Sequence, residues 1–135
     1  MKTIIYSEDR NITLRNLTEL FLSVDWASGE YPGKLFTAVK NYEKVIGAYD
    51  NDKLVGLICV MDDGVMTAYI HYLLVNPKYQ SYGIGRELIE RVKEYYKDYL
   101  RLVLVCYDTV VGFYEKVGFK KADGVKAMYL TELRN

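Results

Sequence analysis

The stretch "LLVNPKYQSYGIGREL", residues 73–88, sets two glycines two positions apart between an apolar segment and a helical pattern. Gly83 and Gly85 come directly before a run in which apolar residues repeat every three to four positions. Glu87 stands four residues before Arg91, a spacing that supports a helix through an ion pair. The predicted helix spans residues 84–100, and its apolar face consists of Ile84, Leu88, Val92, Tyr95 and Tyr99. The sequence therefore predicts a strand, a glycine loop and a long helix in succession.

The start of this helix is expected to bind an anion. A helix N-terminus offers amide N–H groups without partners inside the helix, together with a partial positive charge. Glycines let a ligand approach such a backbone closely, and phosphate is its most natural ligand. A dinucleotide-binding fingerprint does not fit, because it needs a glycine where Leu88 stands, and the Gly-Lys-Ser/Thr of a P-loop is absent. A glycine turn without any ligand is the alternative.

Length and composition are those of an ordinary single domain. The chain has 135 residues and a formal net charge of zero, so its bulk charge recruits neither nucleic acid nor an acidic membrane. Cys59 and Cys106 each lie in an apolar run, as reduced core cysteines do, and no metal-ligand spacing is present. The N-terminus is too short and polar for a signal peptide, and no apolar run approaches about 18 residues. We expect one domain over residues 1–135, no metal and a cytoplasmic location.

Turn residues and apolar periodicity divide the rest of the chain into elements. Asp50-Asn51-Asp52 and Asp62-Asp63-Gly64 cut residues 44–77 into three strands of an antiparallel meander. The third strand, residues 66–75, is almost continuously apolar and aromatic, which favours burial on both faces. The other predicted elements are strands at 2–7, 101–107 and 126–133 and helices at 12–26, 34–42 and 109–117. The order β-α-α-β-β-β-α-β-α-β predicts an α/β (α+β) fold with helices packed on a mixed sheet.

Two motifs stand on either side of the predicted helix and the strand after it. Gln80-x-x-Gly83-x-Gly85 follows "LLVNPKY", and "GFYEKVGF" stands at residues 112–119. Together they resemble the motifs of the GCN5-related N-acetyltransferase (GNAT) superfamily. The resemblance covers Val55 to Phe119. It implies a single-domain fold with a mixed, mostly antiparallel sheet of about six to seven strands and helices on both faces. It also implies acetyl-coenzyme A (acetyl-CoA) as the cosubstrate of an N-acetyltransferase.

The resemblance gives the backbone around the glycine loop a role. The pantetheine arm of coenzyme A is expected to pair, as an extra strand would, with Leu73, Leu74 and Val75 at a bulged strand end. The Leu73 amide is then the expected hydrogen-bond donor to the thioester oxygen. The pyrophosphate is expected on the amides of Gln80, Ser81, Tyr82, Gly83, Ile84, Gly85 and Arg86.

Within the superfamily, the sequence looks most like the arylalkylamine N-acetyltransferases. They carry histidines on the strand before a Leu-Ala-Val that matches residues 73–75, and a Phe-Tyr-Glu-Lys-x-Gly-Phe run that matches residues 113–119. This likeness implies that His71 is the general base for the amine and that Tyr114 is the general acid near the coenzyme A sulfur. Tyr69 stands where the second histidine of that family would be, and strand alternation puts His71 on the same face as Tyr69 and Leu73. The alternative is that His71 and Tyr114 only contribute to packing.

The acceptor amine is expected under the loop between the first two helices. Fourteen tyrosines favour an aromatic-lined cavity or an interface. Aromatic rings and one carboxylate would suit a small ammonium compound. The predicted substrate-binding residues are Trp26, Glu30, Tyr31, Tyr69 and Tyr107, with Tyr129 as a neighbour. Many superfamily members carry an asparagine where Tyr107 stands, so Tyr107 is expected to contact either coenzyme A or the acceptor. The alternative for Trp26 is a core residue at the end of an amphipathic helix.

Three other functions stay open at this level. A protein or peptide N-acetyltransferase needs an open groove for a chain, whereas a loop-capped pocket suits a small molecule. A coenzyme A-binding module would bind the cosubstrate without turnover, and a purely structural domain would not bind it. The last predicted strand, residues 126–133, leaves an exposed edge that is compatible with a monomer or a homodimer.

Overall fold

Five strands, paired in chain order, form the sheet of the computed structural model, which describes residues 2–133. The first three pairings are antiparallel, and β4 pairs with β5 in parallel. The predicted antiparallel meander is therefore confirmed. The strands are β1 (Ile5–Ser7), β2 (Lys44–Asp50), β3 (Lys53–Asp62), β4 (Thr67–Val75) and β5 (Arg101–Leu104).

The helices lie close to where the sequence predicts them. Thr13 precedes α1, and its hydroxyl accepts a hydrogen bond from the Asn16 amide at 3.1 Å, an ordinary N-cap. Pro32 begins α2, where its missing N–H costs nothing. The α-helices are α1 (Leu14–Ser23), α2 (Pro32–Asn41), α3 (Ile84–Tyr95) and α4 (Val111–Lys116), and the 3₁₀ turns are η1 (Ala27–Glu30), η2 (Pro77–Tyr82) and η3 (Asp108–Val110).

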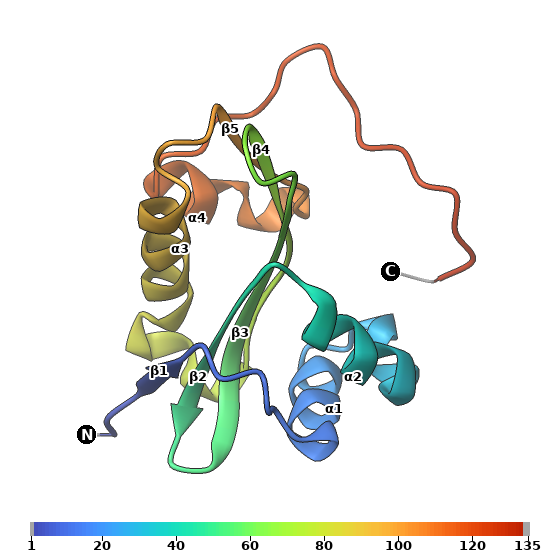
Figure 1. Ribbon diagram of the computed structural model, residues 1–135, viewed down its shortest axis with the longest axis vertical. Coiled ribbons are helices and arrows are strands. Elements are labelled where there is room, and N and C mark those ends of the chain that lie inside the picture. The colour runs from blue at the N-terminus through green and yellow to red at the C-terminus, as the bar shows by residue number, and fades with distance from the viewer. Residues whose placement is uncertain (1, 134–135) are drawn as a thin grey trace.

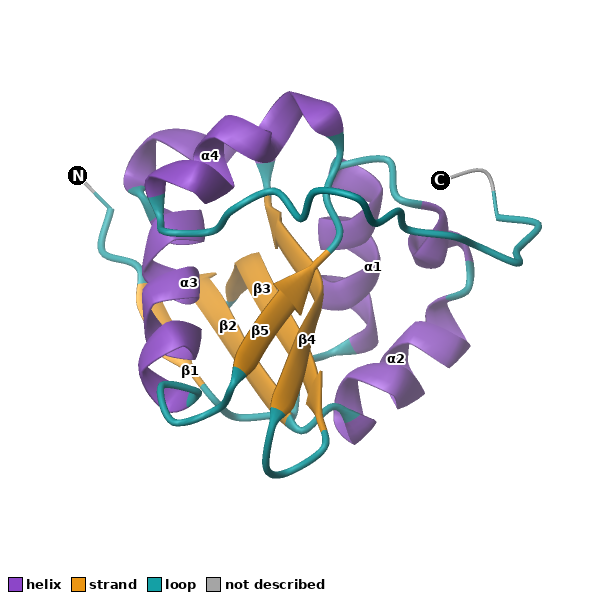
Figure 2. Ribbon diagram, turned by 90° about the horizontal axis from the view of Figure 1, so that it is seen from above, coloured by secondary structure: helices purple, strands orange, loops and turns teal. Residues whose placement is uncertain are grey.

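Helices cover both faces of the sheet, as predicted. Figure 1 shows α3 and α4 on one side of the strands and α1 and α2 on the other, and Figure 2 shows the same layers from above. Two separate clusters of buried apolar side chains fill the two interfaces. Since β4 and β5 run in parallel, α3 is the crossover that returns the chain to the same end of the sheet.

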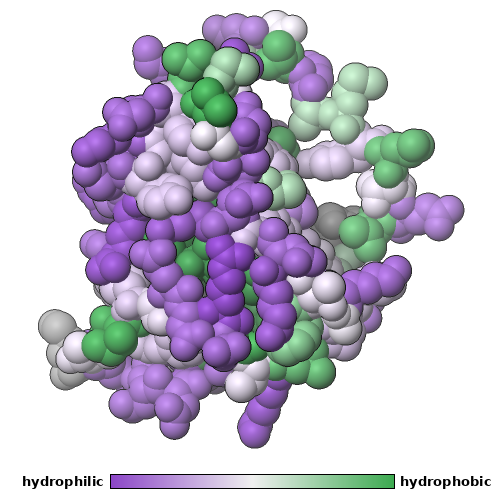
Figure 3. Space-filling model, in the orientation of Figure 1, coloured by the Kyte–Doolittle hydropathy of each residue, from purple (hydrophilic) through white to green (hydrophobic). Residues whose placement is uncertain are grey.

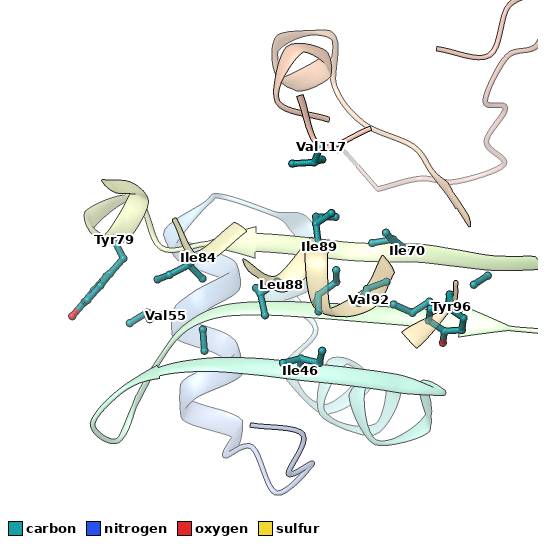
Figure 4. Packing of buried hydrophobic residues seen from close by; sticks show 14 residues of the cluster. Ile46, Val55, Ile70, Tyr79, Ile84, Leu88, Ile89, Val92, Tyr96 and Val117 are labelled. Carbon is teal, nitrogen blue, oxygen red and sulfur yellow. The ribbon is translucent and has the colours of Figure 1, made fainter. Parts of the chain in front are cut away.

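The long helix packs on the sheet through residues spaced four apart. Ile84, Leu88 and Val92 are buried, and Figure 4 shows them facing Ile46 and Val55 of the sheet. The predicted ion pair between Arg91 and Glu87 is present on the exposed side, with 2.7 Å between Nε and Oε2. The amphipathic pattern thus fixes which side of α3 meets the strands.

The C-terminal end of the apolar face of α3 differs from the prediction. Tyr96, not Tyr95, continues it: Tyr96 is 3% exposed and Tyr95 is 57% exposed. The Tyr96 hydroxyl donates a hydrogen bond to Asp62 Oδ2 at 2.7 Å, so the buried ring keeps a partner for its polar end. The Tyr95 ring instead lies 3.9 Å from the Lys44 ammonium. The prediction for Tyr95 is wrong because the four-residue spacing runs on to position 96.

The prediction of a strand at residues 126–133, and with it a sheet of six to seven strands, is also wrong. Residues 119–133 form no helix or strand, and Figure 1 shows this segment leaving α4 as an arc outside the sheet. Figure 3 shows green apolar side chains projecting where the segment runs. Met128 and Leu130 are among its exposed residues. Alternating apolar residues form a strand only where a neighbouring strand pairs with their backbone, and in the described part of the chain the sheet ends at β5 without such a pairing.

The described residues also bear on the expectations for membranes and metals. None of the helices in residues 2–133 is long and apolar enough to cross a membrane. The same part of the chain holds no group of three or more His, Cys, Asp or Glu side chains arranged to bind a metal ion.

Candidate active site

A cavity opens where β4 and β5 part. The parallel pairing joins Thr67–Ile70 to Arg101–Leu104 and goes no further, while β4 continues to Val75 alongside β3. Beyond Ile70 a cavity of about 970 Å³ lies beside β4. The second half of β4, the glycine loop, the segment after β5 and α4 all contribute to its wall. Motifs far apart in the sequence therefore meet at one site.

A β-bulge in β4 decides which side chains face this cavity. Tyr72 pairs with Cys59 and Ile70 pairs with Val60, so His71 is an extra residue without an opposite partner. The bulge puts His71 and Tyr72 on the same face, where their rings stack with centroids 4.2 Å apart. Leu73 turns to the opposite face and packs against the α3 core. The prediction that His71 and Leu73 share a face is wrong for this reason.

Burial of β4 is also less complete than the apolar pattern predicts. Ala68, Ile70 and Leu74 are buried, whereas His71 is exposed and the remaining residues of the strand are half-buried. The aromatic residues Tyr69 and Tyr72 line the cavity, and Tyr72 also packs against the core cluster on the α1 side. The prediction of burial on both faces is wrong because one face of β4 forms the wall of an open cavity.

His71 lies among aromatic rings. The Tyr42 hydroxyl is 2.6 Å from its Nδ1, and the Tyr69 ring stacks at 5.7 Å between centroids. These neighbours keep water from part of the imidazole, and this burial lowers the pKa of His71 below its usual value. The ring is therefore neutral at neutral pH and is able to accept a proton.

Part of the cavity wall is aromatic. Trp26 and Tyr72 face the cavity, and both rings pack on buried Phe21. The Tyr72 hydroxyl and Ser28 Oγ form a hydrogen bond of 2.6 Å. Tyr69, Tyr107 and Tyr129 also line the cavity. Such a surface suits an apolar or cationic group.

The glycine loop leaves the start of α3 open. Gly83 is the N-cap residue, adopts a left-handed conformation with φ 70° and ψ 20°, and has no side chain with which to cap the helix. The first intrahelical bond runs from the Glu87 amide to the Gly83 carbonyl at 3.1 Å, so the amides of residues 84–86 precede it. A Cβ on Gly83 would meet no atom within 4 Å, and Gly83 lines the cavity. Space for an anion thus lies directly before the helix.

The second glycine brings α3 and α4 together. A Cβ on Gly85 would lie 3.3 Å from the ring of Phe113, tighter than an ordinary contact. Because Phe113 directly precedes Tyr114 on α4, the helix start and Tyr114 are close neighbours. A larger residue at position 85 would push α4 away from the loop.

Hydrogen bonds to neighbouring strands hold the loop itself. Tyr79 in η2 is buried, and its hydroxyl donates a hydrogen bond to Asp50 Oδ2 at 2.6 Å. The Gln80 side chain donates to the Val75 carbonyl at 3.3 Å, and the Asn76 amide donates to the Val55 carbonyl at 2.8 Å. These bonds join the loop to β2, to β3 and to the end of β4.

Tyr114 stands on α4 with its ring held by two neighbours. Phe113 and Phe119 meet it edge to face, at centroid distances of 5.1 and 5.9 Å. Burial, with a smaller contribution from Cys106, raises the pKa of Tyr114 to about 12. The hydroxyl therefore keeps its hydrogen at neutral pH and is available as a donor.

Most of the predicted site residues meet at the cavity, and a few do not. Glu30, Tyr31, Ser81 and Tyr82 are not among its lining residues, although Gln80 and Gly83, on either side of Ser81 and Tyr82, are. The predicted residues that line it are Trp26, Tyr69, His71, Leu73, Leu74, Val75, Gln80, Gly83, Ile84, Gly85, Arg86, Tyr107 and Tyr114. Sequence reasoning missed Tyr42 and Tyr72: Tyr72 faces the cavity only because of the bulge, and Tyr42 reaches His71 from a distant helix end.

The fold and the cavity define a class of protein. A helix start open to an anion and two titratable side chains around one cavity suit transfer of a group carried by a phosphate-containing cosubstrate. Residues 11–119 match the model of the acetyltransferase (GNAT) family, and the chain belongs to this family. GNAT enzymes use acetyl-CoA as their cosubstrate, so the protein is an acetyltransferase.

Known relatives agree with this membership. The uncharacterized N-acetyltransferase ycf52 of Pyropia yezoensis is 32% identical over 135 residues, which cover 95% of this chain and 77% of the relative. The histone acetyltransferase TAP1 of Glycine max is 29% identical, over 96% of this chain and 62% of that protein. GCN5-related N-acetyltransferase 1, chloroplastic, of Arabidopsis thaliana is 36% identical over 77 residues, 54% of this chain and 39% of that protein.

A solved structure has the same fold. A GNAT-family acetyltransferase from Streptococcus pneumoniae superposes with a TM-score of 0.82 at 25% identity, and the match covers 96% of this chain and 99% of that one. The GNAT fold predicted from the two motifs is therefore confirmed, with fewer strands than expected.

Proposed function

We propose that the protein moves the acetyl group of acetyl-CoA directly to the primary amine of a small molecule. The observation that carries this proposal is the single cavity that holds the open start of α3, His71 and Tyr114. Bound acetyl-CoA supplies an activated acyl group as a thioester. The chain has to hold it, accept the proton of the amine and protonate the departing sulfur.

The residues around the loop fit coenzyme A. The pyrophosphate is proposed to lie on the amides of Gln80 to Arg86, where the partial charge of the α3 N-terminus favours an anion. The side of β4 beyond Ile70 is free of β5. Its backbone at Leu73, Leu74 and Val75 is the proposed partner of the pantetheine arm.

The proton transfers follow from the two titratable side chains. The amine nitrogen forms a bond to the acetyl carbon, and the bond from that carbon to sulfur breaks. His71 takes the proton that the amine loses, Tyr114 gives its hydroxyl hydrogen to the thiolate, and solvent returns both side chains to their starting state. The Leu73 amide is the proposed donor to the thioester oxygen as negative charge develops there.

The aromatic wall supports a small-molecule acceptor. Trp26, Tyr69 and Tyr107 offer flat apolar faces that attract an ammonium group. Glu30 and Tyr31 lie outside this wall, so the proposal depends on the three aromatic residues. The likeness of residues 113–119 and of His71 to the arylalkylamine N-acetyltransferases also supports an amine attached to a compact body.

Location and assembly stay predictions. A cytoplasmic protein is expected from the sequence, whereas relatives such as the Arabidopsis protein are named chloroplastic. A monomer and a homodimer are both compatible with the described residues.

An acceptor screen tests this function. Thiol release from acetyl-CoA is measured with a panel of small primary amines and, in parallel, with lysine-containing peptides. We expect the best small amine to exceed the best peptide by at least about tenfold in kcat/KM, with the acetylated amine identified by mass. Turnover with peptides alone would make the protein a peptide N-acetyltransferase. If acetyl-CoA binds but no acceptor causes thiol release, the protein is a coenzyme A-binding module that does not catalyse transfer.

A further inference from the structure

Tyr42 connects the end of α2 to His71. It is the residue that follows the last turn of α2, and its side chain is 7% exposed within the core between the sheet and α1. Its hydroxyl lies 2.6 Å from Nδ1 of His71, which is 29 residues further along the chain. No other hydrogen bond of this hydroxyl is found among residues 2–133. The hydrogen bond found for the Tyr42 hydroxyl is therefore the one to His71.

The backbone of Tyr42 is itself held in place. The Arg10 guanidinium donates hydrogen bonds to the carbonyl oxygens of Lys40, Tyr42 and Glu43, at 3.2 Å for Lys40 and 2.6 Å for Glu43. These carbonyls belong to the end of α2 and the turn into β2, where helix carbonyls lack intrahelical partners. Arg10 thus fixes the position from which Tyr42 reaches the imidazole.

The contact also orients the imidazole. Because Tyr42 occupies Nδ1, Nε2 is the ring nitrogen left for a ligand in the cavity. The Tyr69 and Tyr72 rings stack on His71 at 5.7 and 4.2 Å, with interplanar angles of 25° and 18°. Three contacts therefore restrict the rotation and tilt of a side chain that is otherwise exposed.

We propose that Tyr42 is the positioning residue of His71: its hydroxyl oxygen accepts the Nδ1 hydrogen and so presents Nε2 to the acceptor amine as the proton-accepting atom. This inference rests on the proposed function, in which His71 takes the proton of the amine. An imidazole that has gained a proton carries an N–H on each nitrogen. The Tyr42 oxygen is the partner that the charged ring needs at Nδ1.

The Tyr42 hydrogen bond favours the charged ring, whereas burial of the imidazole disfavours it. A hydrogen bond from a cation is stronger than one between neutral groups, so the Tyr42 contact gains strength when His71 is protonated. Burial raises the pKa of Tyr42 well above its usual value, so Tyr42 does not compete for the proton. The other titratable groups packed around this pair are Tyr69 and Tyr72 of β4 and Cys59 of β3.

Tyr42→Phe tests the inference, because it removes one oxygen and keeps the ring in the core. The matched control is Tyr49→Phe, since Tyr49 packs against the same core cluster and no hydrogen bond to His71 involves it. We expect Tyr42→Phe to lower kcat about tenfold at neutral pH while the KM for acetyl-CoA stays within about twofold. We expect Tyr49→Phe to behave as the wild type does.

A second readout does not depend on turnover. His71 is the only histidine of the chain, so its ring signals in an NMR titration need no assignment. Tyr42→Phe should lower the pKa of His71, because the charged ring loses its partner at Nδ1. The ¹⁵N shifts of the wild type should place the hydrogen of the neutral ring on Nδ1.

The two readouts separate the possible failures. A wild-type ring with its hydrogen on Nε2, or a His71 pKa equal in Tyr42→Phe and Tyr49→Phe, would overturn the inference. So would equal kcat values in the two variants when the wild type is active. If the wild type releases no thiol with any amine, the proposed function fails. The NMR comparison still decides in that case whether Tyr42 holds the ring.

Discussion

Replacing Tyr114 with phenylalanine should lower kcat by at least about 10²-fold and leave the affinity for acetyl-CoA within about twofold. The substitution removes the proposed proton donor to the thiolate and keeps the ring between Phe113 and Phe119. Since the pKa of Tyr114 is raised to about 12, the hydroxyl holds its hydrogen throughout the pH range of an ordinary assay. The loss should therefore be the same at every pH from about 7 to 10.

A matched variant shows whether the loss of kcat is caused by the missing hydroxyl hydrogen. Tyr6 packs against the same core cluster as Tyr114 and does not line the cavity, so Tyr6→Phe should retain wild-type turnover. Single-turnover thiol release and calorimetric titration of acetyl-CoA measure chemistry and binding separately. If Tyr114→Phe keeps more than about a third of the wild-type kcat, Tyr114 is a packing residue and another group protonates the sulfur.

Replacing His71 with alanine should lower kcat/KM for the amine by about 10²–10⁴-fold, the usual contribution of a positioned base. His71→Asn is the informative companion, because its side chain retains hydrogen-bonding atoms near Tyr42 but cannot take up a proton. Both variants should be similarly inactive, and both should bind acetyl-CoA. A loss of less than about threefold in either one would remove His71 from the mechanism.

The pH dependence of the wild type gives an independent check. A base acts only when neutral, so activity should rise with pH through the pKa of His71 and level off above it. Because burial lowers this pKa from 6.5, the rise should be centred below pH 6.5 and be complete near neutral pH. In His71→Ala this rise should disappear. A rise centred well above pH 7 would point to the acceptor amine or to another group.

The glycine loop and its helix could be predicted because their signals are local. Gly83 needs a left-handed φ, and the apolar spacing that starts at Ile84 sets the face of α3 that meets the sheet. The GNAT fold followed from this segment together with residues 112–119. Signals of this kind depend on residues close together in the sequence and not on contacts between distant segments.

The parts that could not be predicted depend on contacts between distant segments. The bulge at His71 arises from the pairing of β4 with β3, and it reverses the faces of Tyr72 and Leu73 relative to simple alternation. The contact of Tyr42 with His71 depends on where α2 ends. Residues 126–133 have the alternation of a strand, but four of them, Ala127, Tyr129, Thr131 and Leu133, face the cavity without pairing to the sheet.

The most direct test of the central claim, that the open start of α3 binds the coenzyme A pyrophosphate, is a calorimetric titration of three proteins with acetyl-CoA. They are the wild type, Gly83→Ala and Gly64→Ala. Gly83 and Gly64 both have a positive φ, 70° and 83°, and a Cβ added to either one would meet no atom within 4 Å. Only Gly83 of the two lines the cavity.

The wild type and Gly64→Ala should bind with a Kd in the range of about 1–100 µM, and Gly83→Ala should bind at least about tenfold more weakly. The strain of a left-handed alanine is common to both variants, so the difference reports contact with the ligand. Equal affinities in all three proteins, or no binding to the wild type at millimolar acetyl-CoA, would contradict the claim.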